Sequence, residues 1–303
     1  MNIFSKFINL KKILVTGHTG FIGTNLIKKL NNYELIGISK NILKNLDIIQ
    51  IKKDIRNITT KDIPSDLYCI IHLAAMSHVE SCHNNPKACF EMNVQGTQNL
   101  LEISRNSNPK FIYPSTGHVY GIPQKHTISE SHPKNPTSIY AGSKLAGEII
   151  CESYSHAYKM DLSIVRLFSV YGPHEPNYKV TSEIISQLLN KNPISLGNLY
   201  PKRDFVYVSD VVDAIELILK QSRGFNVYNI GYEKSYSILD LCNILKKITG
   251  QKNQIISTKL QSRKQEIDEV ISNSSKIKKL GWKPKTNIIR GLELTLDWYR
   301  SKK

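Results

Sequence analysis

The feature that most limits the fold is a set of three spaced glycines near the start of the sequence. The β-branched run Lys12–Thr16 is followed by Gly17-His-Thr-Gly20-Phe-Ile-Gly23, which opens a helix-like pattern. Glycines allow a tight turn between a strand and a helix, and they let backbone N–H groups approach a bound anion. This order of strand, turn and helix predicts a dinucleotide-binding unit. The residues expected at the pyrophosphate are Gly17, Gly20, Phe21, Ile22 and Gly23.

Short apolar runs alternate with helix-like segments over the first 170 residues. The runs lie at 12–16, 34–39, 48–52, 69–73, 111–115 and 162–167, and a helix-like segment spans 88–104. Continuous apolar strands separated by helices indicate a parallel sheet that is covered on both faces. The sequence therefore predicts an α/β fold with a Rossmann-type doubly wound parallel sheet.

The pattern changes after about residue 170, where prolines interrupt shorter and more mixed segments. A strand followed by a helix is still indicated over 206–219. Another strand is indicated over 225–230, and a helix over 288–300. We expect this part to form a smaller C-terminal α/β lobe.

The basic composition needs an explanation, because the formal net charge is +16. The 41 lysine and arginine residues are spread along the chain rather than gathered in a block, so no nucleic-acid partner is expected. No apolar run approaches the roughly 18 residues of a membrane span, and the first residues do not resemble a secretory signal. A cytoplasmic location without a membrane partner is therefore expected.

The five cysteines are scattered and include no Cys-x-x-Cys pair. This spacing predicts neither a metal site nor a disulfide framework, which agrees with a reducing compartment.

The residues that would contact the adenosine ribose differ from the commonest pattern. A dinucleotide site often ends its second strand with an acidic residue, whereas this chain has Ser39 and Lys40 there. A hydroxyl and a cation suit a 2′-phosphate, so this position favours NADP unless Lys40 is only a surface lysine. Asp54 and Ile55, after the third strand, are expected near the adenine.

A tyrosine and a lysine four residues apart provide candidate acid–base chemistry. Tyr140 and Lys144 would lie on one face of a helix. A tyrosine has a pKa near ~10 in water, so it acts as a base at neutral pH only where nearby cations favour phenolate. Lys144 and an oxidised nicotinamide would both favour it, which makes Tyr140 a candidate acid–base group. Ser115 and Thr116 end the preceding strand, at the sheet edge where open α/β folds bind ligands.

Together these motifs resemble the extended short-chain dehydrogenase/reductase family, in particular its NAD-dependent epimerase/dehydratase group, which acts on nucleotide sugars. The resemblance covers about residues 11–300 and follows the family's motif order. Its motifs are the glycine turn, His72-Leu-Ala-Ala75, Asn93-Val-Gln-Gly-Thr97, Ser115-Thr116 with Val119-Tyr-Gly121, Tyr140 with Lys144, Arg203-Asp-Phe205 with Asp210, and Arg263 followed by Lys276 and Leu280-Gly-Trp282-Lys-Pro284.

The resemblance implies a role for each position. Tyr140 would be the catalytic acid–base, Lys144 would bind the nicotinamide ribose and tune Tyr140, and Thr116 would hydrogen-bond the reacting sugar oxygen. The further cofactor contacts implied are Leu73, Ala74, Ala75, Asn93, Tyr140 and Lys144. The substrate contacts implied are Ser77, Ser115, Thr116, Ser169, Arg203 and Arg263, and the two arginines would bind the nucleotide diphosphate. Residues 11–170 would form the NAD(P)-binding Rossmann domain and residues 171–303 the nucleotide-sugar-binding lobe, with the chain partly interleaved.

Within the family, the sequence favours an epimerase similar to UDP-hexose C4 epimerases, which work by transient hydride transfer at the sugar ring. The 4,6-dehydratases resemble one another in an acidic pair after the catalytic threonine, where this chain has Gly117 and His118. A dehydratase is therefore not expected. The alternative is an NADPH-dependent nucleotide 4-keto-sugar reductase, because Lys40 suits NADPH and the segment before Arg203 resembles GDP-sugar enzymes. Ser169 replaces an asparagine that is common in the epimerases.

A third hypothesis is a non-catalytic dinucleotide sensor or RNA-binding relative. Such relatives typically lose the catalytic tyrosine or lysine, and this chain has both Tyr140 and Lys144. The expected cofactor is thus NAD or NADP and the expected partner is a nucleotide-diphosphate sugar. Family members are often dimers through paired helices, so a homodimer is one expected assembly.

Overall fold

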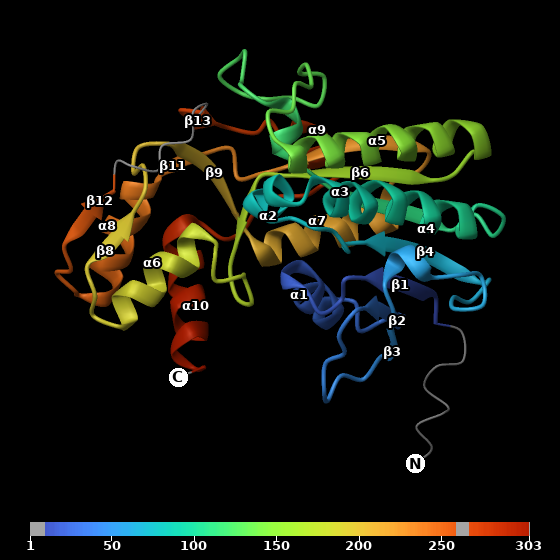
Figure 1. Ribbon diagram of the computed structural model, residues 1–303, viewed down its shortest axis with the longest axis horizontal. Helices are drawn as coiled ribbons and strands as arrows, with labels where there is room; N and C mark the ends of the chain where they lie inside the picture. The colour runs from blue at the N-terminus through green and yellow to red at the C-terminus, as the bar shows by residue number, and fades with distance from the viewer. Residues whose placement is uncertain (1–9, 259–266, 303) are drawn as a thin grey trace. The chain divides into compact units, whose positions relative to one another are not determined.

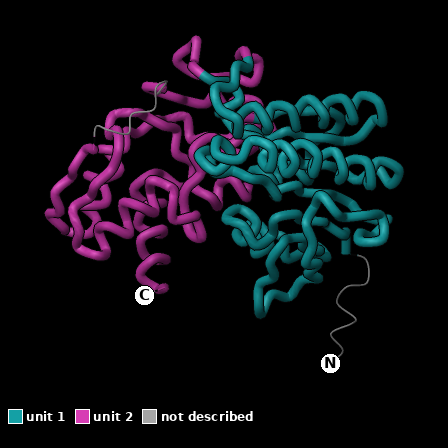
Figure 2. The backbone as a smooth tube through the Cα atoms, viewed as in Figure 1, with its two compact units in different colours: residues 1–121, 134–166, 214–228 teal, residues 122–133, 167–213, 229–303 magenta. Residues whose placement is uncertain are grey.

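A computed structural model describes residues 10–258 and 267–302 of the chain. The chain divides into two compact units, which Figure 2 shows in different colours. Unit 1 comprises residues 1–121, 134–166 and 214–228, and unit 2 comprises residues 122–133, 167–213 and 229–303. The chain therefore passes between the units several times.

The described part of unit 1 is built on a seven-stranded sheet with the strand order β10-β6-β5-β4-β1-β2-β3 (Figure 1). Neighbouring strands from β5 to β3 pair in parallel. The strands are β1 (Lys12–Thr16), β2 (Glu34–Ser39), β3 (Ile49–Lys52), β4 (Leu67–His72), β5 (Lys110–Thr116), β6 (Leu162–Leu167) and β10 (Phe225–Ile230). The strand order reverses direction at β1, so that ligands would bind beyond the carboxyl ends of the strands on either side of it.

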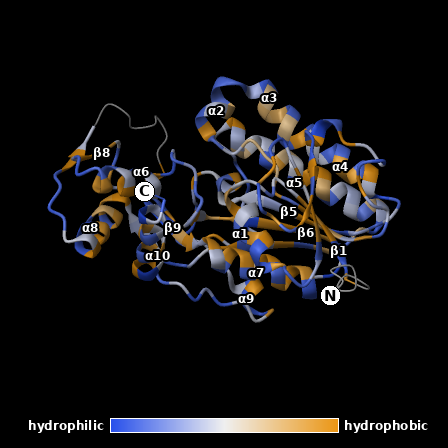
Figure 3. Ribbon diagram, turned by 90° about the horizontal axis from the view of Figure 1, so that it is seen from below, coloured by the Kyte–Doolittle hydropathy of each residue, from blue (hydrophilic) through white to orange (hydrophobic). Residues whose placement is uncertain are grey.

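Helices cover both faces of this sheet. Figure 3 shows α4 and α5 on one side of the hydrophobic strands and α1 and α7 on the other. The helical elements are α1 (Phe21–Lys29), η2 (Ile55–Asn57), α2 (Val79–Asn84), α3 (Pro86–Phe90), the π-helical η3 (Glu91–Gln95), α4 (Gly96–Ser104), η4 (Gly117–Tyr120), α5 (Ile139–Tyr158) and α7 (Val208–Gln221). The core includes Leu14, Ile70, Phe111, Leu100 and Ile164, whose burial from water stabilises the layers.

Unit 2 contains smaller sheets and its own apolar core. Strand β9 (Lys202–Tyr207) pairs with β7 (Ser169–Tyr171), β11 (Ser235–Ser237) and β13 (Glu269–Val270), and β8 (Ile194–Leu196) pairs with β12 (Ile255–Ser257). The helices are α6 (Val180–Leu189), α8 (Ile238–Thr249), α9 (Ser275–Lys278) and α10 (Ile288–Arg300). Apolar faces of α6, α8 and α10 supply much of the core of this unit.

The structure confirms the predicted α/β class and most of the predicted elements. The strands expected at 34–39, 162–167 and 225–230 have those bounds. The helix-like segment 88–104 is three elements rather than one, because a π-helical turn at Glu91–Gln95 separates α3 from α4. The predicted division of roles between residues 11–170 and 171–303 stays a prediction. None of the helices in the described ranges is long and apolar enough to span a membrane.

Candidate functional site

The glycine turn is packed so closely that side chains would not fit. Gly17 has a φ of +70°, a conformation that favours glycine, and a Cβ there would lie 2.8 Å from the backbone nitrogen of Ala74. A Cβ on Gly23 would lie 2.7 Å from Cα of His18. The turn therefore rests directly on the first turn of α1 and on the end of β4, as a close-approach dinucleotide turn requires.

The amino-terminal end of α1 is free to bind an anion. Gly20 is the N-cap residue, and among the described residues no side chain caps this helix. The first N–H groups of a helix lack intrahelical partners, so those of Phe21, Ile22 and Gly23 are available to a pyrophosphate, which the helix dipole also favours. The turn and this helix end fit a dinucleotide, whose nicotinamide would supply the hydride acceptor and donor when bound.

At the carboxyl end of β2, Lys40 has a partner. Its Nζ lies 3.1 Å from the carboxylate of Asp54, which also accepts hydrogen bonds from Arg56, at 2.7 Å from Nη2. Hydrogen bonds from Arg56 hold the pKa of Asp54 well below its usual value, with Lys40 adding to the effect. Ser39 Oγ lies 2.8 Å from Oγ1 of Thr19 in the glycine turn. The Lys40 charge is thus offset by the carboxylate of Asp54, which follows strand β3. Ile55, the next residue after Asp54, is buried in the core.

A chain of hydrogen bonds that was not predicted from the sequence runs through His72 and connects the end of β1, just before the glycine turn, to helix α4. Burial lowers the pKa of His72 to about 3, so its ring is neutral. Nδ1 of His72 lies 2.7 Å from Oγ1 of Thr16, and Nε2 lies 3.0 Å from Oγ1 of Thr97. Thr97 donates to the carbonyl of Asn93, and Thr16 Oγ1 accepts from the backbone N–H of Ala74. Because Thr97 uses its hydroxyl proton for the Asn93 carbonyl, it must accept from Nε2 of His72, so Nε2 carries the ring proton. Nδ1 then accepts from the hydroxyl of Thr16.

Asn93 joins two segments that flank the expected nicotinamide position. It is buried in the π-helical turn, and its Oδ1 accepts from the backbone N–H of Met76 at 2.8 Å. Its Nδ2 donates to the carbonyl of Met76 and to Oγ of Ser143, both at 2.9 Å. A π-helical turn commonly marks a functional position in a helix. Asn93 fixes the loop after β4, which contains Leu73, Ala74, Ala75 and Ser77, against helix α5.

The three predicted catalytic residues lie at the end of β5 and the start of α5. Thr116 is buried, and its Oγ1 accepts a hydrogen bond from the backbone N–H of His118. The rings of His118 and Tyr140 meet edge to face with centroids 6.3 Å apart, so the segment after Thr116 contacts the first turn of α5. Ser138 caps α5 through the N–H of Ala141, which places Tyr140 in that first turn.

Lys144 is held in an unusual environment for a lysine. Its side chain is buried, and its Nζ lies 3.9 Å from the centre of the Tyr113 ring. Burial lowers the pKa of Lys144 to about 8. The ammonium is therefore retained at neutral pH but deprotonates more readily than a surface lysine, as expected of a group tuned for chemistry.

A buried ion pair lies one helical turn beyond Lys144, and it was also not predicted. Glu148 of α5 and Arg166 of β6 are both nearly inaccessible to water, and their closest atoms are 2.7 Å apart. The hydroxyl of Ser115 donates a hydrogen bond to Oε1 of Glu148, with 2.5 Å between the two oxygens. The substrate role of Ser115 stays a prediction, since this hydroxyl is turned into the network. An arginine in a strand that is otherwise apolar apart from Ser163 was the signal available in the sequence.

The predicted substrate residues of unit 2 are only partly described. Ser169 begins β7, and Arg203 lies on β9, where its Nη1 donates to the carbonyls of Lys202 and Ile267. Arg263 lies outside the described residues, so its phosphate-binding role stays a prediction. The roles of Ser77, Ser169 and Arg203 also stay predictions.

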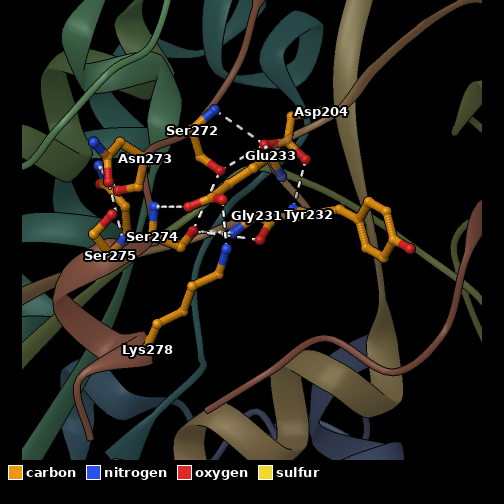
Figure 4. A network of polar contacts seen from close by, with 10 residues as sticks. Asp204, Gly231, Tyr232, Glu233, Ser272, Asn273, Ser274, Ser275 and Lys278 are labelled. Atoms are coloured by element: carbon orange, nitrogen blue, oxygen red, sulfur yellow. Dashed lines mark hydrogen bonds and ion pairs between the residues drawn. The ribbon is translucent and has the colours of Figure 1, made fainter. Parts of the chain in front are cut away.

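A network beside Arg203 holds its strand in place (Figure 4). Asp204 accepts hydrogen bonds from the backbone N–H groups of Tyr232, Glu233 and Ser272, and from the Ser272 hydroxyl. Glu233 in turn accepts from Ser274 and pairs with Lys278. Several donors on one buried carboxylate satisfy it fully, so the network fixes β9 against the 231–233 turn and the segment after β13.

The fold, the glycine turn and the buried lysine define the class of protein, which is a dinucleotide-dependent enzyme with a Rossmann-type sheet. The family model described as the NAD dependent epimerase/dehydratase family matches residues 13–231. The chain therefore belongs to the NAD-dependent epimerase/dehydratase family.

Curated relatives extend over nearly the whole chain. A putative UDP-glucose 4-epimerase from Methanocaldococcus jannaschii is 34% identical over 304 residues, covering 95% of this chain and 98% of that protein. A dTDP-D-glucose 4,6-dehydratase from Bos taurus is 32% identical over 317 residues, covering 96% of this chain and 89% of the relative. Both epimerases and dehydratases are thus among the relatives.

Solved structures agree with this membership. The UDP-glucose 4-epimerase of Thermotoga maritima, solved with UDP-glucose, is 29% identical with a TM-score of 0.90, covering 96% of this chain and 99% of that one. The UDP-glucuronic acid 4-epimerase of Bacillus cereus, solved with UDP-glucuronic acid and NAD, is 29% identical with a TM-score of 0.87, covering 96% and 100%. The predicted extended short-chain dehydrogenase/reductase family, the enzyme class and the nicotinamide cofactor are confirmed at this level.

Proposed function

We propose that this protein is an NAD-dependent nucleotide-sugar epimerase that acts at C4 of a UDP-hexose or a similar nucleotide sugar. The observation that carries the proposal is the arrangement of Thr116, Tyr140 and Lys144 beside a glycine turn that fits a dinucleotide. The relatives with epimerase names support it.

Each catalytic side chain has a defined task in this proposal. Lys144, buried yet protonated at neutral pH, favours the phenolate form of Tyr140 one turn earlier on the helix. The phenolate takes the proton from the C4 hydroxyl and returns it to the C4 oxygen after the sugar has presented its other face. Thr116, at the end of β5, hydrogen-bonds the same oxygen and orients it. Oxidation and re-reduction occur at one carbon, so the reaction has no net redox change.

The residues after Thr116 favour epimerisation over dehydration. Elimination of water needs a second acid–base group beside the neighbouring carbon, and the 4,6-dehydratases resemble one another in a carboxylate pair there. Gly117 and His118 stand at these positions, in the 3-10 turn η4. Dehydratase relatives at 32% identity make this the distinction that most needs an experiment.

The surroundings of Lys40 support NAD rather than NADP. The sequence alone favoured NADP because Lys40 suits a 2′-phosphate. The Asp54 carboxylate pairs with Lys40 and is held in place by Arg56, which pairs as well with Glu91. The charges of Lys40 and Arg56 are balanced by those of Asp54 and Glu91, so this cluster has no net charge. A 2′-phosphate bound beside Lys40 would also lie near the Asp54 carboxylate. We therefore propose that NAD is the working cofactor.

The test is to identify the bound cofactor and to screen UDP-, GDP-, dTDP- and CDP-sugars. An epimerase retains NAD as purified and converts one nucleotide sugar into an equilibrium mixture with its C4 epimer, without accumulating reduced cofactor. Formation of a 4-keto-6-deoxy sugar would instead show a dehydratase and overturn the proposal.

The second candidate is a nucleotide 4-keto-sugar reductase, which the lysine at position 40 favours. A reductase consumes NADPH stoichiometrically and exchanges it freely, so the same screen run with added NADPH distinguishes it.

We also propose that Ser77, Ser115, Thr116, Ser169, Arg203 and Arg263 contact the nucleotide sugar, as the family resemblance implies. A location in the cytoplasm and a homodimeric assembly are proposed on the same basis.

A further inference from the structure

The proposed mechanism leaves one buried charged group on the catalytic helix unused. Tyr140, Lys144 and Glu148 are spaced by four residues each on α5, so they follow one face of this helix. Glu148 is 2% exposed and its partner Arg166 is also 2% exposed. A buried ion pair stabilises a fold little or not at all compared with apolar side chains, so its presence here needs another reason.

The ion pair connects the two elements that hold the catalytic residues. Arg166 donates to both carboxylate oxygens of Glu148, at 3.0 Å from Nε to Oε1 and at 2.7 Å from Nη2 to Oε2. The same carboxylate accepts from Ser115, the residue before Thr116. Arg166 Nη1 also donates to the hydroxyl of Tyr120 at 2.8 Å, in the turn that follows Thr116. Helix α5, strand β6 and both sides of Thr116 are therefore fixed to one another.

The ion pair also contributes to the electrostatic environment of the Lys144 ammonium. Glu148 lies on the same helix face as Lys144 and raises its pKa against the effect of burial. Among the described residues, other titratable groups near the Lys144 ammonium include His72 of β4, Cys89 of α3, Tyr113 of β5, and Tyr140 and Cys151 of α5.

Most of these groups carry no charge near neutral pH. The pKa of His72 is about 3, and burial raises the pKa values of Tyr113 and Cys151 well above their usual values. The carboxylate of Glu148 is therefore one anion that favours a protonated Lys144, beside the Tyr140 phenolate of the proposed mechanism. A charge in a protein interior is weakly screened by solvent, so this carboxylate acts on Lys144 even though it is paired with Arg166.

We propose that Glu148, held by Arg166, is a positioning residue for catalysis, which keeps Lys144 charged and holds the Thr116 end of β5 against α5. This role rests on the proposed function for its catalytic consequence. Its effect on Lys144 is a property of unit 1 alone and can be measured without any substrate.

The experiment is an NMR titration of protein with ¹³C-labelled lysine, in which the Lys144 signal is the one that is lost in Lys144→Met. In Glu148→Gln the titration midpoint of Lys144 should fall by about one pH unit or more, because an adjacent negative charge is removed. The matched control is Glu152→Gln, the same change one turn further on at a side chain that is 44% exposed. That variant should titrate as the wild type does.

A second variant covers the case in which Glu148→Gln does not fold. Glu148→Gln combined with Arg166→Met leaves no unpaired buried charge, so it should retain its circular dichroism spectrum. Lys144 should still titrate at a lower pH than in the wild type. A wild-type midpoint in either folded variant overturns the proposal.

Kinetics separate a positioning role from a structural one. In the variants kcat should fall about fivefold or more at pH 8 with the KM for the nucleotide sugar unchanged, and the alkaline limb of the pH profile should move with the Lys144 midpoint. A lower midpoint in a protein whose wild type epimerises no nucleotide sugar would contradict the proposed function instead. Wild-type kcat and pH profile in the double variant would show that the pair is only structural.

Discussion

Replacing Lys144 by methionine should stabilise the protein while it abolishes activity. Methionine has a similar length and no charge, and the site is apolar enough to depress the pKa of the lysine from 10.5 to about 8. At about 1.4 kcal/mol for each pH unit, this fall corresponds to about 3 kcal/mol that the native state loses by holding the ammonium in its interior. Loss of the contact with the Tyr113 ring offsets part of the gain, at about 1 kcal/mol.

The pH dependence gives this prediction its signature. Because the folded pKa of Lys144 lies below its unfolded value, the unfolded state binds more protons between about pH 8 and 10.5, and wild-type stability rises through this window relative to the variant. The advantage of Lys144→Met, about 2 kcal/mol at pH 7, should therefore disappear by about pH 10.5.

Urea denaturation of the protein without bound cofactor, followed at several pH values, is the assay. Lys87→Met, the same change at an exposed position of α3, is the control and should shift the free energy of unfolding by less than about 0.5 kcal/mol. If the free energy of unfolding of Lys144→Met were lower than that of the wild type by about 2 kcal/mol or more, the idea that Lys144 destabilises the fold and is kept for catalysis would be refuted.

Three further predictions address other parts of the site. Tyr140→Phe should lower kcat by roughly 10²–10⁴-fold with cofactor binding retained, which single-turnover kinetics and dinucleotide titration can check; unchanged turnover would remove Tyr140 from the mechanism. Lys40→Asp should weaken NADP binding further and leave NAD affinity within a few fold in calorimetric titrations, whereas a large loss of NAD affinity would show that Lys40 contacts the cofactor directly. His72, with its pKa lowered to about 3 by burial, should make wild-type stability fall as the pH drops from about 6.5 towards 3. The slope in this window should be steeper than in His72→Asn by about 1.4 kcal/mol per pH unit, and equal slopes would mean that His72 is protonated in the native state.

The local features of this protein follow directly from its sequence. The glycine spacing from Gly17 to Gly23 specifies a strand, a tight turn and a helix, because the conformations that glycine allows and the apolar periodicity act between near neighbours. The same reasoning placed Tyr140 and Lys144 on one helix face, since a spacing of four residues is a property of the helix itself. Strand bounds such as Glu34–Ser39 were predicted for the same reason.

The charge state and partners of the site residues depended on the tertiary structure. Glu148 and Arg166 are 18 residues apart, and the chain of hydrogen bonds through His72 joins Thr16 to Thr97. Neither contact has a periodic signal in the sequence, although Arg166 and His72 stand out as ionisable residues in mostly apolar strands.

This dependence on tertiary structure changed one prediction and bears on another. The segment 88–104 reads as one helix, but Asn93 forms hydrogen bonds to Met76 and Ser143, and the chain adopts a π-helical turn there. The role of Lys40 stays a prediction, although the fold brings Asp54 to within 3.1 Å of its ammonium. Sequence periodicity determines which residues share an element, whereas desolvation and pairing depend on which elements pack together, and these decide what an ionisable side chain can do.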